Sequence, residues 1–147
     1  MKDAGSALRV VVASLVLLVA GRSLAADWPQ WRGPQRNGVS QETGLLKEWP
    51  KEGPKLVWQV KNIGSGYSTP AVVGERIYLL ANEGLDNELV QARAVIDGKQ
   101  VWSTRIGKVG NPNQQPNYPA ARSTPTVDGD SLYALGSNVC GHIFWHR

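Results

Sequence analysis

The chain has 147 residues, enough for one ordinary domain. Its 16 Lys and Arg outnumber its 12 Asp and Glu, but residues 1–25 hold three of the basic residues and one acidic residue, so the formal charge falls from +4 to +2 without them. The remaining basic residues are scattered rather than gathered in a stripe, which argues against nucleic-acid binding. The single cysteine, Cys140, excludes a fold held together by internal disulfides.

The N-terminal segment 1–25 is typical of a cleavable secretory signal peptide. Lys2 and Arg9 precede or border an apolar run of 11 residues, Val10–Ala20, and Ser23–Ala25 supplies the small residues of a cleavage site. The alternatives are a membrane anchor and a buried helix, but an anchor needs about 20 apolar residues to cross a bilayer. We therefore predict an extracytoplasmic chain, periplasmic or secreted, with no membrane span after cleavage.

Residues 26–54 form a lead-in rich in Trp, Pro and Gly, with no lasting strand or helix period. From residue 55 the pattern changes, and 55–60 (Lys-Leu-Val-Trp-Gln-Val) predicts a β-strand. Four more short strands are expected, at 69–73, 76–81, 89–96 and 99–106. Gly- and Asp-containing turns separate them, and Asp97-Gly98 is a strong hairpin signal. The sequence therefore predicts an all-β fold with antiparallel strands.

Two sequence elements recur in the same order. Ser68–Gly74 (Ser-Thr-Pro-Ala-Val-Val-Gly) returns 55 residues later as Ser123–Gly129, and Lys55–Trp58 returns 44 residues later as Lys99–Trp102. The extra 11 residues of the first displacement indicate an inserted loop, most simply at 107–117. Such repetition is typical of architectures in which each unit buries its faces against its neighbours.

The segment Ala92–Trp102 resembles the tryptophan-docking repeat of the pyrroloquinoline-quinone (PQQ)-like β-propellers, which has the form Ala-x-Asp-x-x-Thr-Gly-x-x-x-Trp. Ala92, Gly98 and Trp102 match this form, whereas Ala94 replaces the Asp and Asp97 replaces the Thr. The lead-in at 27–34 (Asp-Trp-Pro-Gln-Trp-Arg-Gly-Pro) is also similar to the start of many secreted bacterial members of this group.

The resemblance covers residues 27–135 and implies a ring of four-stranded β-propeller blades, of which complete propellers have about 4–8. Residues 55–135 would supply one full blade at 68–106 and parts of two others, at 55–60 and 123–135. In that architecture four residues would dock one blade on the next: Trp58, Ala92, Gly98 and Trp102. Residues 136–147 form an atypical tail without a second docking repeat, so we expect a truncated or frame-shifted part of a longer protein. The alternative is a short natural chain that closes by self-association.

No catalytic, cofactor-binding or metal-binding set is evident in the sequence. Quinoproteins of this superfold bind PQQ with calcium and often use two adjacent cysteines, whereas Cys140 stands alone. His142 and His146 have the spacing of zinc ligands on a helix but few companions. Turn solvation explains the acidic residues of the expected turns, where calcium would need about 6–8 converging oxygens. These residues are Glu75, Asp86, Asp97, Asp128 and Asp130.

Trp28 and Trp31 have two interpretations: stacking on a ligand such as a sugar or quinone, or plugging or closing the propeller, which we favour. The predicted function is a non-catalytic extracytoplasmic scaffold that binds a protein partner or associates with itself. The competing hypothesis is a fragment of a PQQ-dependent alcohol dehydrogenase, with PQQ and calcium as cofactors and its active site in other blades. A third is a gene remnant without a function of its own.

Overall fold

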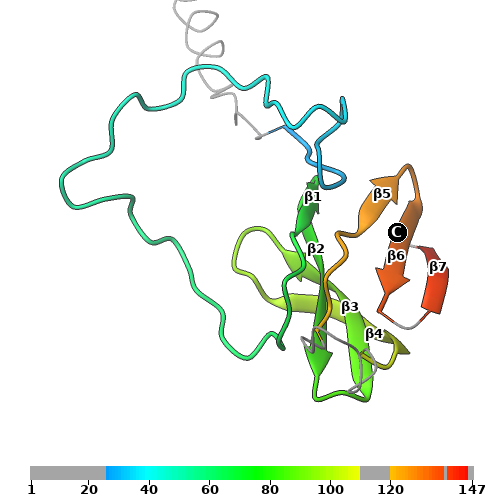
Figure 1. Ribbon diagram of the computed structural model, residues 1–147. Helices are drawn as coiled ribbons and strands as arrows, with labels where there is room; N and C mark the ends of the chain where they lie inside the picture. The colour runs from blue at the N-terminus through cyan, green and yellow to red at the C-terminus, as the bar shows by residue number, and fades with distance from the viewer. Residues whose placement is uncertain (1–25, 110–119, 138, 146–147) are drawn as a thin grey trace, which may run out of the picture.

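The computed structural model describes residues 26–109 and 120–137 and the backbone of 139–145, which form two antiparallel β-sheets (Figure 1). The first sheet contains four strands in chain order, β1 (Ala71–Val73), β2 (Arg76–Glu83), β3 (Asn87–Ala94) and β4 (Gln100–Gly107). The second contains β5 (Thr126–Asp128), β6 (Ser131–Gly136) and β7 (Val139–Trp145). This confirms the all-β prediction.

Two predicted features fall outside the described residues. They are the signal peptide at 1–25 and most of the inserted loop at 107–117. Within the part of the chain that is described, no helix is long and apolar enough to cross a membrane.

The four strands predicted between 69 and 106 are present with shifted ends. β1 begins at Ala71, directly after Pro70, which has no N–H to donate to a strand ladder. β2 and β3 extend toward each other and leave only the short turn 84–86 between them. The turn glycines Gly74 and Gly98 have φ of 55° and 70°, a backbone conformation that favours glycine.

The sequence repeat is also a repeat of strand register. Ala71 pairs with Tyr78 in the β1–β2 hairpin, and Thr126 pairs with Tyr133 in the β5–β6 hairpin. Both partners are displaced by the same 55 residues. The two hairpins are therefore equivalent positions of successive structural units, although they lie in different sheets.

The predicted strand at 55–60 is wrong. Among the described residues this segment joins no sheet, and Figure 1 shows the chain between the lead-in and β1 as a wide loop beside the sheets. Its sequence equivalent, β4, is a strand because β3 lies beside it and supplies its hydrogen bonds. A strand sequence without a neighbouring strand leaves its backbone groups to water, so local preference alone does not make an element.

The atypical tail contributes a further strand. Gly136 completes β6, and Val139–Trp145 forms β7, which pairs antiparallel with β6 so that Ile143 lies opposite Tyr133. The second unit therefore repeats the first three strands of the first unit.

The hydrophobic core lies between the two sheets. Strand alternation places every second side chain of a strand on the same face, and one face of each sheet is buried. The four-stranded sheet and β6 contribute buried side chains to one cluster, which includes Tyr78, Leu80, Val90, Ala92, Leu132 and Ala134. Trp102, Val73 and Val127 pack against this cluster and are partly buried.

The lead-in holds the first strands of both sheets together. Trp28 exchanges two backbone hydrogen bonds with Val72 in β1, at 2.7 and 2.9 Å. The next residue, Pro29, accepts a hydrogen bond of 2.8 Å from the backbone N–H of Val127 in β5. Val72 and Val127 are equivalent in the repeat, so this segment spans both units.

Candidate functional site

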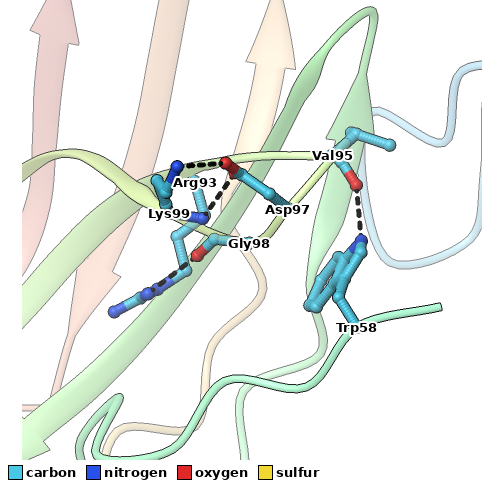
Figure 2. Close-up of polar contacts among 6 residues, drawn as sticks. All are labelled: Trp58, Arg93, Val95, Asp97, Gly98 and Lys99. Atoms are coloured by element: carbon cyan, nitrogen blue, oxygen red, sulfur yellow. Dashed lines mark hydrogen bonds and ion pairs between the residues drawn. The ribbon is translucent and has the colours of Figure 1, made fainter. Parts of the chain in front are cut away.

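The contact between Trp58 and the β3–β4 turn is the best-defined site on the outside of the four-stranded sheet (Figure 2). The Trp58 indole N–H donates a hydrogen bond of 2.9 Å to the backbone oxygen of Val95. Its ring lies against Gly98, where an added Cβ would approach the ring to 2.7 Å and the Val60 side chain to 2.5 Å. Only glycine fits this position, because of both its space and its positive φ.

Polar contacts hold the β3–β4 turn in the shape that receives Trp58. Asp97 accepts a hydrogen bond of 3.0 Å from the Lys99 backbone N–H, and the Lys99 ammonium lies 3.0 Å from its other oxygen. Arg93 donates to the Gly98 carbonyl at 3.0 Å (Figure 2). The backbone hydrogen bond from Lys99, then its side chain, lowers the pKa of Asp97 below the ordinary value of 3.8. Asp97 therefore stabilises this turn most when it is ionised.

Because the pKa of Asp97 is lower in the folded chain than in the unfolded chain, its stabilisation is present above the ordinary pKa and is lost as pH falls through the lowered pKa. We expect Asp97→Asn to lower the melting temperature at pH 7, with the difference from wild type shrinking between about pH 5 and about pH 2. Thermal melts across this range measure it, with Asp130→Asn as an exposed-carboxylate control. A gap that stays constant with pH would contradict the role of the ionised group.

Ala92 and Trp102 meet across β3 and β4. Ala92 is fully buried and is paired with Trp102 in the sheet register. The Trp102 ring is half-buried, with its centroid 6.3 Å from that of Tyr78. Burial raises the pKa of the Tyr78 phenol, and Arg76 offsets part of this effect. The four residues proposed for docking thus fall into two contacts, Trp58 with Gly98 and Ala92 with Trp102.

A second group of polar residues lies where the β2–β3 turn, the segment before β5 and the end of β6 meet. Asn82 is buried; it donates to the Gly84 carbonyl at 2.8 Å and accepts from the Ala121 N–H at 3.2 Å. Glu88 is fully buried and accepts hydrogen bonds from the Ser137 N–H at 2.7 Å and the Ser137 hydroxyl at 3.2 Å. These contacts join the two sheets.

Sequence reasoning missed Asn82 and Glu88. The available signal was their position in the two-residue alternation of the strands. Glu88 shares a strand face with Val90 and Ala92, both core residues. A carboxylate in register with buried apolar side chains has to find hydrogen-bond partners, because burial without them is costly.

The exposed rim of this group holds one ion pair and two hydrogen bonds from Arg105. The Lys108 ammonium lies 2.9 Å from the Asp86 carboxylate, and Arg105 donates to the Asp86 carbonyl at 2.9 Å and the Asn87 side chain at 3.0 Å. The hydrogen bond and charge of Lys108 lower the pKa of Asp86. Asp86 is exposed, so water screens this pair.

The residues at this end of the sheets do not fit a calcium-bound quinone. Calcium takes about 6–8 oxygen ligands, whereas the Asn82 oxygen, both Glu88 oxygens and one Asp86 oxygen are engaged by protein donors. Over residues 26–109 and 120–137, no three His, Cys, Asp or Glu side chains gather as a metal site would require. Cys140 and His142 lie in β7, where only the backbone is described, and His146 lies outside the described residues.

The two lead-in tryptophans differ in their surroundings. The Trp28 ring packs against Gly33 and its N–H donates to the Trp31 carbonyl at 3.3 Å. The Trp31 side chain is 68% exposed. Trp28 therefore belongs to the strap between the sheets, whereas Trp31 presents its ring to solvent.

Comparisons with protein-family models, with curated proteins and with solved structures find no match to this chain.

Proposed function

We propose that the chain is a segment of an extracytoplasmic PQQ-like β-propeller that works as a non-catalytic scaffold for binding or assembling proteins. The observation that supports this most directly is the docking of Trp58 on the Gly98 turn. In this contact, the Trp58 side chain, which precedes the first unit in the sequence, binds the glycine turn of that unit. The 44-residue repeat gives Trp102 the same place relative to the unit that follows it.

The connection between the two sheets supports a regular succession of units. The Ser68 hydroxyl accepts from the Leu80 N–H at 3.1 Å and donates to the Ser123 carbonyl at 2.8 Å. Ser123 is the repeat equivalent of Ser68, and its own hydroxyl donates to the carbonyl of Leu135, the equivalent of Leu80. Each repeat serine thus contacts its own second strand, and the first also contacts the next unit, as a repeat protein requires.

The surfaces of the two sheets favour a scaffold over an enzyme. The buried polar side chains at the loop end, Asn82 and Glu88, have hydrogen-bond partners within the protein that join the sheets, so they serve structure. The side chains left exposed on β6 include large ones, Tyr133 and Leu135. Apolar faces of this kind are suited to binding protein.

Reconstitution of the full-length chain with PQQ and calcium, followed by a dye-reduction assay with alcohols, tests the scaffold against the dehydrogenase. We expect the rate with PQQ to equal that of a PQQ blank without protein. Sustained alcohol-dependent turnover above the blank would overturn the scaffold and favour the quinoprotein hypothesis. Apo protein with calcium alone is the second control.

A further inference from the structure

We propose that this chain associates head to tail with further copies of itself. The tail face is the exposed side of the β5–β6–β7 sheet, marked by Tyr133 and Leu135. The head face is the opposite end of the molecule, marked by Ile77, Leu79 and the segment 55–60. This inference rests on the proposed scaffold function and names the partner and the surfaces.

The tail face carries Tyr and Leu at the repeat positions whose equivalents in the first sheet are buried within the chain. Tyr78 and Leu80 are 7% and 1% exposed, because the second sheet packs on them. Their repeat equivalents, Tyr133 and Leu135, are 42% and 54% exposed. The same residue pair in the same register is thus covered in one unit and open in the other. The surface that covers it within the chain is the β6 face with Leu132 and Ala134, which identifies the equivalent face of another unit as the surface that fits the tail face.

The head face shows the complementary difference. Leu132 and Ala134 on β6 are 1% and 3% exposed, because they pack on the first sheet. Their equivalents Ile77 and Leu79 on β2 are only half-buried. The chain's own segment covers the neighbouring part of that face, where Gln91 donates to the Ile63 carbonyl at 2.9 Å.

Residues 55–60 supply the missing strand for a neighbouring copy. This segment matches β4 in sequence but pairs with no described strand, and its Leu56 and Val57 side chains are 72% and 83% exposed. Within the described residues the second sheet has only three strands and ends at β7. An edge strand is a template for another strand, so 55–60 of one copy adds to β7 of the next.

The docking of Trp58 makes these two contacts compatible. It fixes 55–60 beside the Gly98 turn at the head of its own copy. A neighbouring sheet that pairs with 55–60 is thereby brought over Ile77 and Leu79. Strand alternation puts the head and tail faces on opposite sides of the two stacked sheets, so one chain cannot satisfy both. Such a heterologous contact builds a closed ring or an open chain of copies.

Light scattering on size-exclusion fractions of the full-length chain, expressed with residues 1–25 so that the host processes them, measures the assembly over a range of concentrations. We expect a mass of at least two copies for wild type. The tail variant, Tyr133→Glu with Leu135→Glu, and the head variant, Val57→Pro with Gln59→Pro, are each expected to have the mass of one copy. Proline cannot donate to a ladder, and all four side chains are exposed, so the fold is retained; far-UV circular dichroism checks this.

Mixing the two variants is the decisive step. Each retains one intact face, so an equimolar mixture is expected to form dimers and nothing larger. The control, Leu45→Glu with Leu46→Glu, changes side chains that are 67% and 70% exposed in the lead-in and is expected to keep the wild-type mass. A wild-type monomer, folded variants that keep the wild-type mass, a mixture that stays monomeric, or a control that dissociates would each overturn the proposal.

This outcome is separate from that of the scaffold proposal. A monomer without quinone-dependent turnover would remove the self-association and leave the scaffold to bind another protein. PQQ-dependent turnover would remove the scaffold function whatever mass is measured.

Discussion

Replacing Glu88 with alanine is expected to lower the free energy of unfolding by about 3 kcal/mol. Glu88 is fully buried and accepts two hydrogen bonds from Ser137, which lies 49 residues away, directly after β6 of the second sheet. A hydrogen bond to a charged group contributes about 1.5–3 kcal/mol, and loss of the carboxylate leaves the Ser137 N–H without this acceptor. Urea unfolding at one fixed protein concentration measures the change, because assembly would shift the midpoint with concentration.

Two further variants separate the buried contact from a general loss of charge. Glu83→Ala removes an exposed carboxylate at the end of β2 and is expected to change stability by less than about 0.5 kcal/mol. Ser137→Ala removes only the hydroxyl donor and should cost about 1 kcal/mol. If Glu88→Ala unfolded at the same urea concentration as Glu83→Ala, Glu88 would not join the two sheets.

Gly98→Ala is expected to cost about 3 kcal/mol, of which about 1 kcal/mol comes from the left-handed backbone and about 2 kcal/mol from crowding. The new Cβ would lie 2.7 Å from the Trp58 ring and 2.5 Å from the Val60 side chain, so both have to move. Gly74→Ala is the matched control. Gly74 also has a positive φ, of 55°, in a turn of the same sheet, but an added Cβ there meets nothing within 4 Å. It should cost only about 1 kcal/mol.

A double-mutant cycle with Trp58→Ala measures how much of the crowding at Gly98→Ala comes from the Trp58 ring. In the Trp58→Ala background, Gly98→Ala should cost less than in the wild-type background but more than Gly74→Ala, because the Trp58 ring is absent while the Val60 side chain remains. Equal costs of Gly98→Ala in both backgrounds would mean that Trp58 does not dock on this turn. Thermal or urea unfolding of the four proteins provides the data.

Local sequence was sufficient for the strands of the first sheet. The aliphatic and aromatic residues of 76–81 and the turn residues Gly74 and Gly98 act within a few positions of the chain, so the hairpins were predicted with only their ends displaced. The repeat of Ser68–Gly74 at Ser123–Gly129 likewise predicted a second hairpin, whose register proved equivalent. The four docking residues were predicted from the resemblance to a known repeat. Only the structure showed that Trp58 contacts Gly98.

Pairings between distant segments required the tertiary structure. Residues 55–60 have a strand sequence but no strand beside them, since a sheet hydrogen bond needs a partner that local sequence does not provide. Glu88 looks like a solvated strand residue until the fold brings Ser137 to it from the other sheet. Tyr78 and Tyr133 have equivalent places in the repeat, and only the packing of one sheet on the other makes the first a core residue and leaves the second exposed.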